Sequence, residues 1–209
     1  MESEYNNLIN KLFAEGHIKL PAILQAFQER DRALFLPIDQ VPFVGEDRPL
    51  PIGYDQTISQ PYTVSFILHL ADPKQGDNIL DVGTGSGWQA ALLASLVAPD
   101  GKVVTVECIK ELAESAKENL EKFSLITNGS VVAIHGNALE IDPLWPVFDK
   151  IIVAAEYTSI PDAWKNALAV GGRIVMPILG RIVVADKISG DNFDIKEYPG
   201  FSFVPLMPK

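Results

Sequence analysis

The chain has 209 residues, of which 47% are hydrophobic and 21% charged, proportions typical of one globular domain with a sizeable core. A net charge of −10 disfavours attraction to nucleic acid or an anionic membrane, and a single cysteine, Cys108, excludes an internal disulfide and a cysteine-based zinc cluster. No apolar run reaches the ~20 residues that span a bilayer, and the start, Met1 to Tyr5, lacks signal-peptide features, so we expect a cytoplasmic protein.

Two helices are predicted before residue 37. Apolar residues recur at helical spacing from residue 4 to 15, and Gly16 ends this helix. Pro21 starts a second segment, whose apolar positions continue to Phe35. We expect both segments to pack against the core without taking part in chemistry.

Residues 37–62 carry five prolines and two glycines, which exclude a long helix or a central strand. The same segment is rich in polar and aromatic side chains that can bind ligands: Asp47, Arg48, Tyr54, Gln56, Thr57, Ser59, Gln60 and Tyr62. A long irregular segment in a compact domain is usually a functional loop or a linker. This one is neither repetitive nor low in complexity, which favours a binding site. A helix from Thr63 to Leu70 follows.

The most informative stretch is a strand, a glycine turn and a helix. Residues 79–82 form a short apolar run that predicts a buried strand, and three glycines alternate from Gly83 to Gly87. A helical pattern begins at Trp88. This order is typical of the first unit of a nucleotide-binding α/β fold, because glycines allow a ligand to approach the backbone.

The spacing of this turn indicates the kind of nucleotide. A dinucleotide site has Gly-x-Gly-x-x-Gly, whereas this chain has Gly-x-Gly-x-Gly with Asp81 two residues before it. A second strand, 103–106, ends in Glu107, whose carboxylate suits the two hydroxyls of a ribose. The combination favours S-adenosyl-L-methionine over NAD; the alternative is a tight turn without a ligand.

The rest of the chain continues the alternation of strands and helices. The predicted elements are a helix over 109–123, strands over 131–135 and 148–154, a helix over 160–170 ended by Gly171 and Gly172, and strands over 173–177, 181–188 and 193–206. We therefore expect an α/β fold: a doubly wound, mostly parallel sheet with helices on both faces, an antiparallel C-terminal edge and an N-terminal helical extension. The histidines, His17, His69 and His135, lack ligand spacing, and no metal site is expected.

Three blocks of sequence resemble the protein-L-isoaspartate O-methyltransferase family. They are PLPIGYDQTISQPY over 49–62, LDVGTGSGWQAA over 80–91 and FVPL over 203–206. Weaker similarity at 148–153 and 171–175 extends the resemblance over nearly the whole chain. It implies a Rossmann-like class I methyltransferase fold in a single domain, 1–209, with N-terminal helices and a substrate-side loop in 1–62 and the S-adenosylmethionine-binding core in 63–209.

The resemblance also implies an activity. The family transfers a methyl group from S-adenosyl-L-methionine to the free carboxylate of L-isoaspartyl residues in damaged proteins and peptides. The ester collapses to a succinimide, which reopens partly to normal aspartate. The expected partners are isoaspartyl-containing proteins and peptides, with no nucleic acid and no membrane, bound by a monomer. Two alternatives remain: a carboxyl methyltransferase for a different acid, and a binding protein without activity.

The site residues follow from the motif and the resemblance together. Ser59 is the expected catalytic residue, orienting the acceptor carboxylate by a hydrogen bond; the alternative is that it only caps the helix 61–70. The expected cofactor-binding residues are Gln56, Thr57, Ile58, Ser59, Asp81, Gly83, Thr84, Gly85, Ser86, Gly87, Glu107, Cys108, Asn137 and Ala138. The expected substrate-binding residues are Ile52, Gly53, Tyr54, Ser59, Gln60, Val204, Pro205 and Leu206.

Two positions depart from the family pattern. The family usually has Gly-Asp-Gly after the third strand, with the Asp near the adenine, and this chain has Gly136-Asn137-Ala138. An Asn side-chain oxygen can still accept a hydrogen bond from an adenine amino group. Glu156 follows the fourth strand, where small residues are usual, and introduces a carboxylate near the site. The acceptor is therefore less well defined by the sequence than the cofactor.

Overall fold

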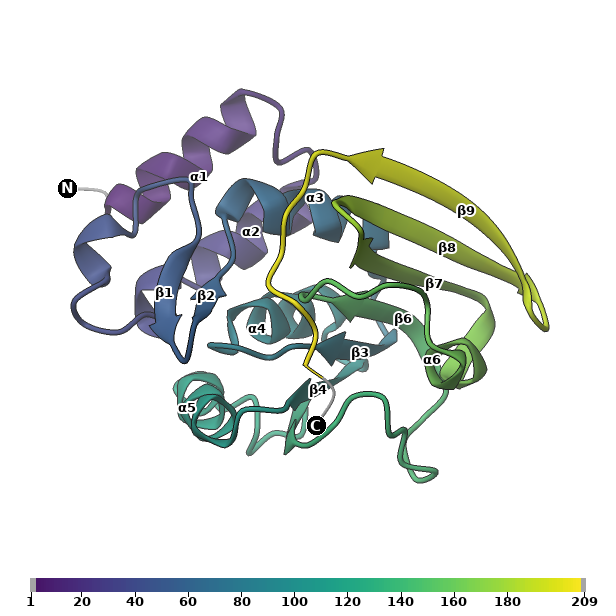
Figure 1. Ribbon diagram of the computed structural model, residues 1–209. Helices are drawn as coiled ribbons and strands as arrows, with labels where there is room; N and C mark the ends of the chain where they lie inside the picture. The colour runs from purple at the N-terminus through teal and green to yellow at the C-terminus, as the bar shows by residue number, and fades with distance from the viewer. Residues whose placement is uncertain (1–2, 208–209) are drawn as a thin grey trace.

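A computed structural model describes residues 3–207 of the chain, and its centre is a seven-stranded sheet (Figure 1). The strand order is β5-β4-β3-β6-β7-β8-β9. The strands of this sheet are β3 (Asn78–Val82), β4 (Lys102–Glu107), β5 (Val131–His135), β6 (Phe148–Val153), β7 (Leu168–Ile178), β8 (Arg181–Ser189) and β9 (Asn192–Pro199). The first five in spatial order run parallel, β8 pairs antiparallel with β7, and β9 pairs antiparallel with β8. The predicted domain 1–209 also includes residues 1, 2, 208 and 209, which lie outside the described residues, and the first two of these belong to the start, Met1 to Tyr5, that lacks signal-peptide features.

Helices cover both faces of the sheet, as the sequence predicts. One face packs against α1 (Glu4–Ala14), α2 (Pro21–Glu29), α3 (Pro61–Ala71), α4 (Trp88–Val97) and α5 (Lys110–Glu121). The other face packs against α6 (Asp162–Ala167) and the irregular segment 138–147. Neighbouring residues of β3 show the division: Ile79 belongs to the first apolar cluster and Leu80 to the second, because successive side chains of a strand point to opposite faces.

The chain reverses its direction of growth across the sheet between β3 and β6. From β3 it adds β4 and then β5 on one side, after which it returns to place β6 and β7 on the other side of β3. At such a reversal the loops after neighbouring parallel strands separate and leave a crevice at the carboxyl ends of the strands. This topology determines where a ligand can bind.

The proline-rich segment forms a small unit of its own. Two 3₁₀ turns, η1 (Arg32–Phe35) and η2 (Val41–Phe43), lead to a hairpin of β1 (Leu50–Gly53) and β2 (Gln56–Ile58). The hairpin does not join the central sheet, in agreement with the absence of a central strand expected there. It lies beside α4 and in front of the carboxyl end of β3 (Figure 1).

The predicted helix over 160–170 is too long. Helix α6 ends at Ala167, and β7 begins at Leu168. Gly171 and Gly172 do not end a helix but lie inside β7, where the register with β6 shifts between Phe148 and Lys150. A Cβ on Gly172 would stand 2.9 Å from two carbonyl oxygens, so the glycine pair permits a bulge that a helical pattern cannot reveal.

The predicted strand over 193–206 is also too long. Strand β9 ends at Pro199, and Gly200 takes a φ of +97°, which turns the chain away from the sheet. Residues 200–206 then run across the carboxyl ends of the parallel strands (Figure 1). Among the described residues, no helix is both long and apolar enough to cross a membrane.

Arg32 fastens the N-terminal unit to the rest of the protein. Its side chain is fully buried, and its guanidinium donates hydrogen bonds to the carbonyl oxygens of Arg48 (2.8 Å) and Ser59 (2.9 Å), with longer ones to Glu46 and Ile58. The same group lies 5.5 Å from the centre of the Trp88 ring. Burial lowers the pKa of Arg32 to about 10, which leaves it charged at neutral pH. One cation therefore holds both ends of the hairpin.

Replacing Arg32 by Met should destabilise the protein by about 3 kcal/mol or more, because hydrogen bonds to charged groups contribute ~1.5–3 kcal/mol each and buried carbonyls would be left unpaired. Urea unfolding monitored by tryptophan fluorescence measures this change. Arg181→Met is the control: Arg181 pairs with Glu197 on the surface, where a salt bridge contributes only ~0–1 kcal/mol. Equal losses in the two variants would contradict the importance of the buried position.

Candidate functional site

A cavity of about 870 Å³ opens at the carboxyl ends of β3, β4 and β6, where the strand order reverses. Its walls come from segments far apart in the chain: 56–59, which is β2 with the residue after it, the glycine turn 83–86, 106–109, 136–139, 154–155 and 204–207. We call it the first cavity.

The glycine turn forms the floor of the first cavity. Gly83 and Gly85 line it, and Gly85 has a φ of +53°. Gly87 does not line it: a Cβ there would stand 3.3 Å from the Ala116 carbonyl oxygen and 3.2 Å from the Leu120 side chain. Gly87 therefore lets α4 begin close to α5. Within the glycine turn, Gly83 and Gly85 face the cavity and Gly87 serves helix packing.

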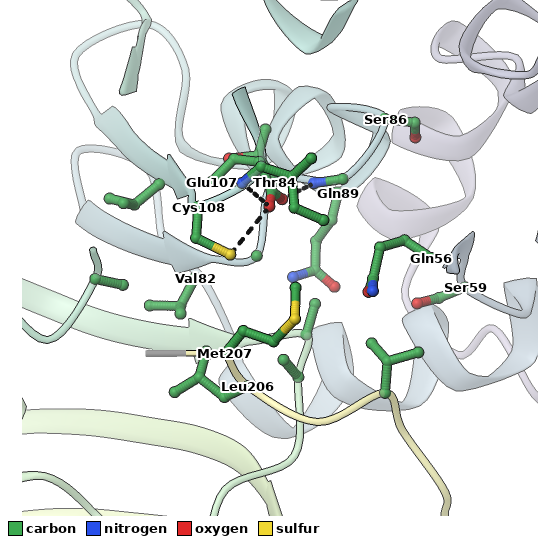
Figure 2. A pocket seen from close by; sticks show the side chains of 18 of the residues that line it. Gln56, Ser59, Val82, Thr84, Ser86, Gln89, Glu107, Cys108, Leu206 and Met207 are labelled. Atoms are coloured by element: carbon green, nitrogen blue, oxygen red, sulfur yellow. Dashed lines mark hydrogen bonds between the residues drawn. The ribbon is translucent and has the colours of Figure 1, made fainter. Parts of the chain in front are cut away.

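Glu107 presents its carboxylate at the end of β4, against the glycine turn. One oxygen accepts a hydrogen bond from the Gly85 amide (2.8 Å), and the other accepts from the Ile109 amide (3.0 Å) and lies 3.7 Å from the Cys108 sulfur (Figure 2). The side chain is 6% exposed and lines the first cavity. A carboxylate has about four lone-pair sites, so this one, fixed by the backbone, retains capacity to accept from a pair of hydroxyls.

Asp81 lies behind the cavity wall rather than on it. It is fully buried and accepts hydrogen bonds from the Gln89 amide (2.8 Å) and the Thr105 hydroxyl (2.7 Å). Thr105 in turn bonds Thr84 at 2.6 Å. Burial raises the pKa of Asp81 to about 6, against the opposing effect of these two donors. Asp81 therefore orients Gln89 and Thr84, both of which line the cavity.

The part of the cavity beyond Glu107 has mostly apolar walls. Cys108, Ile109, Ala138 and Leu139 line it beside Asn137. The Asn137 side-chain oxygen accepts a hydrogen bond from the Leu139 amide (3.0 Å), and its amide nitrogen donates to Glu140 (3.2 Å). The side chain is thus held in a turn with its position defined. Apolar walls beside a fixed amide suit a flat heterocycle such as adenine.

A second cavity, of about 1710 Å³, adjoins the first on the side of the hairpin and α3. Thr57, Ser59, Ala154 and Val204 line both cavities. The other walls of the second cavity include the aromatic residues Tyr62, Phe66, Tyr198, Phe201 and Phe203. Within residues 3–207, none of its lining residues is Asp, Glu, Lys or Arg.

Ser59 stands at the junction of the two cavities. Its side chain faces the first cavity from the same side as Gln56 (Figure 2), and its backbone carbonyl is held by Arg32. The alternative role as a helix cap is wrong, because α3 begins at Pro61 with Gln60 as its N-cap residue. The carboxylate of Asp47 accepts from the Tyr62 amide (2.9 Å) and serves that helix end instead.

The predicted site residues therefore divide by position. Those that line the first cavity are Gln56, Thr57, Ile58, Ser59, Gly83, Thr84, Gly85, Ser86, Glu107, Cys108, Asn137, Ala138, Val204, Pro205 and Leu206. Gln60 lines the second cavity. Asp81, Gly87, Ile52, Gly53 and Tyr54 line neither. Ile52 packs under the glycine turn, 3.4 Å from where a Gly85 Cβ would be, and Tyr54 lies at the exposed tip of the hairpin.

Sequence reasoning missed several lining residues, among them Gln89, Ile109, Leu139, Ala155 and Met207. Gln89 belongs to the motif and is eight residues from Asp81, so its role depends on a contact that a linear pattern does not show. Glu156 lines neither cavity: its carboxylate accepts from the Gly180 amide (3.0 Å). Glu156 therefore lies near the site, as expected, because its backbone bonds the lining residues Val204 and Leu206, but its carboxylate does not face either cavity.

The first cavity fits the expected S-adenosylmethionine in its donors and acceptors. It has one carboxylate placed for a diol, an apolar part of its wall, and glycine backbone that a ligand can approach. No group of three or more His, Cys, Asp or Glu side chains that would hold a metal ion is found within the described part of the chain.

Known proteins resemble this chain in sequence over almost its whole length. The family model of Protein-L-isoaspartate(D-aspartate) O-methyltransferase matches residues 3–209. A protein-L-isoaspartate O-methyltransferase of Ignicoccus hospitalis is 40% identical over 211 residues, covering 99% of each chain. One from Aeropyrum pernix is 43% identical over 204 residues, covering 96% of this chain and 78% of the relative.

Solved structures agree with the fold. A Plasmodium falciparum structure assigned to the same family, in complex with S-adenosyl-L-homocysteine, superposes with a TM-score of 0.88 at 22% identity and covers 99% of each chain. A second protein-L-isoaspartate O-methyltransferase has a TM-score of 0.83 at 25% identity, covering 96% of this chain and 65% of its own. The predicted doubly wound α/β fold is confirmed.

The buried Asp81 should make stability depend on pH. Its pKa is about 6 in the folded protein and 3.8 as the ordinary value, so the folded state holds an extra proton between these limits. The contribution of Asp81 to the free energy of unfolding is therefore greatest below pH 3.8. It decreases by on the order of 3 kcal/mol as the pH rises through 6. Urea unfolding from pH 4 to pH 7 of wild type and Asp81→Asn measures the difference, because the amide does not titrate.

Asp162→Asn is the control with the opposite sign. The Lys165 hydrogen bond lowers the pKa of this exposed carboxyl, so its contribution is present at neutral pH and is lost as pH falls. Parallel curves for wild type and Asp81→Asn between pH 4 and pH 6 would show that Asp81 takes up no proton on folding.

Proposed function

The chain belongs to the protein-L-isoaspartate O-methyltransferase family, and we propose that its two adjoining cavities are where it transfers a methyl group from S-adenosyl-L-methionine to the free carboxylate of L-isoaspartyl residues. The observation that best supports this assignment is that the two cavities share part of their walls. Ser59 and Thr57 face a cavity suited to a nucleoside on one side and an uncharged, aromatic-rich cavity on the other. A donor and a peptide acceptor can therefore meet at Ser59.

The first cavity is the proposed site of S-adenosyl-L-methionine. Glu107 would bind the ribose hydroxyls, Asn137, Ala138 and Cys108 would surround the adenine, and the segment 83–86 would lie beneath the ligand. Gln89, oriented by Asp81, faces the same space and adds an amide for the polar end of the ligand. When bound, the cofactor supplies an electrophilic methyl group on a sulfonium.

The acceptor requires positioning rather than activation. A carboxyl group with a pKa of ~4 is already an anionic nucleophile at neutral pH, so no general base is needed. The protein must hold a carboxylate oxygen ~3–3.5 Å from the reacting carbon and aligned for displacement. Within the described residues the Ser59 hydroxyl makes no hydrogen bond to another protein group, so it has a donor to offer an incoming carboxylate. Arg32 fixes the backbone that carries it.

The surroundings of Ser59 also limit access of water. Val204, Leu206 and Met207 contribute apolar side chains to the wall of the first cavity, and Figure 2 shows the last two on the side of the cavity opposite Glu107. An anion that loses part of its hydration reacts more readily with a positioned electrophile, and a closed site protects it from competing solvent. Prolines in the segments on both sides of the junction restrict the backbone there, which favours one conformation of the cavity wall.

This arrangement assigns different roles to the two parts of the chain. Residues 1–62 would provide the substrate-side loop and its support, and residues 63–209 the cofactor-binding core, although 56–59 contribute to both. Isoaspartyl proteins and peptides are the proposed partners, bound by a monomer. Methylation would begin repair, because the resulting ester can close to a succinimide that reopens partly to aspartate.

Labelled methyl transfer tests the proposal. An isoaspartyl peptide and its aspartyl isomer are incubated with the protein and S-adenosyl-L-methionine carrying a labelled methyl group. Label on the isoaspartyl peptide alone supports the proposal, whereas equal or absent labelling of both would refute it. Binding of S-adenosylhomocysteine without labelling of either peptide would favour another acid as acceptor, and no binding at millimolar ligand would favour a protein without activity.

Ser59→Ala should reduce turnover ten-fold or more, because ~1.4 kcal/mol of lost positioning in the transition state is a factor of ten. The Ser59 hydroxyl bonds nothing else in the described protein, so the melting temperature and the affinity for S-adenosylhomocysteine should stay near those of wild type. Ser59→Gly provides a second test, since it also removes the hydroxyl. A Ser59→Gly enzyme with wild-type turnover would show that the hydroxyl has no part in the reaction.

Glu107→Ala should weaken S-adenosylhomocysteine binding by ~2–3 kcal/mol, as expected when a charged hydrogen-bond acceptor is removed. Isothermal titration measures the dissociation constant. Glu107→Gln, which keeps one carbonyl acceptor, should fall between wild type and Glu107→Ala, and thermal unfolding shows whether the Gly85 turn remains formed. An unchanged dissociation constant in folded Glu107→Ala would mean that the ribose has another partner.

A further inference from the structure

The segment 200–206, which we call the strap, forms a wall of both cavities. It leaves β9 at Gly200 and crosses the carboxyl ends of the parallel strands (Figure 1). Its first part, Phe201 to Phe203, lines only the second cavity; Val204 lines both; Pro205 and Leu206 line only the first. The position of the strap therefore determines the width of the passage between the proposed donor and acceptor sites.

Two residues outside the strap hold it, one near each end. The carbonyl oxygen of Gly180 accepts hydrogen bonds from the amides of Gly200 and Phe201, both at 3.2 Å. The backbone of Glu156 donates to the Val204 carbonyl (2.7 Å) and accepts from the Leu206 amide (2.7 Å). Gly180 lies in the turn between β7 and β8, and Glu156 follows β6, so the anchors belong to different loops.

The Glu156 side chain joins these two anchors. Its carboxylate accepts a hydrogen bond of 3.0 Å from the Gly180 amide. The turn that contains Gly180 needs such support, because the preceding residue, Leu179, has a φ of +48° and a side chain that is 65% exposed. A left-handed conformation costs a non-glycine residue roughly 1–2 kcal/mol, and here no burial of the leucine offsets that cost.

We propose that Glu156 is a positioning residue for the methyl acceptor: by fixing the Leu179–Gly180 turn through its carboxylate, it holds both ends of the strap and so sets the width of the acceptor passage beside Ser59. This inference rests on the proposed function of the two cavities. Glu156 lines neither of them and touches no reacting group. Its effect is transmitted through Gly180 and through the hydrogen bonds that the strap receives.

Loss of the Glu156 carboxylate should affect peptide binding more than the chemical step. Ser59 and its support by Arg32 do not involve Glu156, so the chemical step should proceed once a peptide is bound. Without the carboxylate the strap should sample displaced positions, which the peptide must reverse on binding. A hydrogen bond worth ~1 kcal/mol corresponds to a ~5-fold change in an equilibrium constant, so Glu156→Ala should raise the KM for an isoaspartyl peptide ~5-fold while kcat changes less than about two-fold.

The first experiment measures the strap directly, in the free protein. Amide hydrogen exchange followed by mass spectrometry should show peptides covering 200–206 exchanging ~5-fold faster in Glu156→Ala than in wild type, by the same ~1 kcal/mol. Glu156→Gln keeps an oxygen that can accept from Gly180, so its exchange and KM should return to near wild type. This readout needs neither cofactor nor turnover.

Glu121→Ala is the matched control. Glu121 also has a carboxylate that accepts from a backbone amide in a turn, that of Thr127 at 3.1 Å, but it lies on α5 and lines neither cavity. Its loss should leave exchange over 200–206 and the peptide KM unchanged. An equal change in both variants would show a general loss of stability and would overturn the proposal.

A second-site substitution tests the link through the turn. Asn-Gly is the favoured pair for a two-residue hairpin turn with both residues left-handed, so Leu179→Asn should make the turn less dependent on Glu156. In the Leu179→Asn background, Glu156→Ala should change strap exchange and KM by less than about two-fold. A full-sized effect there would mean that Glu156 does not act through the turn.

The results separate failure of this inference from failure of the proposed function. Wild-type exchange over 200–206 in Glu156→Ala, or a Glu156→Gln variant as fast as Glu156→Ala, would overturn the role of the carboxylate whatever the substrate. A wild-type protein that methylates no isoaspartyl peptide would refute the proposed function and with it the acceptor role, while the exchange result would still show whether Glu156 holds the strap.

Discussion

A buried guanidinium hydrogen-bonded only to backbone carbonyls is the constraint on which the junction of the two cavities depends. Arg32 comes from a 3₁₀ turn outside the sheet, yet it binds the carbonyl of Arg48 at the entrance of the hairpin and that of Ser59 at its exit. A cation can satisfy several carbonyls at once, and its planar fork fixes their relative directions. Ser59 therefore owes its position less to the hairpin, which is short and separate from the central sheet, than to a side chain twenty-seven residues earlier in the sequence.

The sheet places the other half of the site by topology alone. Parallel strands direct their carboxyl ends to one edge, and the reversal between β3 and β6 leaves space there for a ligand. The groups that face that space are backed by a layer that does not face it: Asp81 orients Gln89 and Thr105, and Thr105 bonds Thr84. Side chains that are locked from behind keep their geometry when a ligand arrives, which is what a reaction limited by alignment requires.

Local patterns in the sequence were enough for strands β3 to β6, the glycine turn and the position of Glu107, because each depends on neighbours within a few residues. The family resemblance added Ser59, whose role stays a prediction, as do those of the other site residues. What the sequence did not reveal depends on distant contacts. From the sequence alone Gly171 and Gly172 resemble a helix end, whereas the structure pairs the strand that contains them with β6. The strand after Asn192 ends earlier than predicted, and Gly180 and Glu156 bind the chain beyond it. Glu156 was expected near the site, but the sequence did not show that its carboxylate binds the Gly180 amide rather than facing a cavity.

The charge of the protein explains why so much of this support is indirect. A chain with a net charge of −10 that binds a carboxylate has to keep its own anions from the acceptor. In the part of the chain that the structure describes, the second cavity is lined by no acidic or basic side chain, and Glu107 is the one charged residue that lines the first. The nearby carboxylates accept hydrogen bonds elsewhere: Asp47 at the start of α3, Glu156 at Gly180 and Asp81 inside the core. Neutral donors such as Ser59 can then orient an anion without holding it so tightly that it reacts slowly, because stabilisation of the ground state alone does not accelerate a reaction.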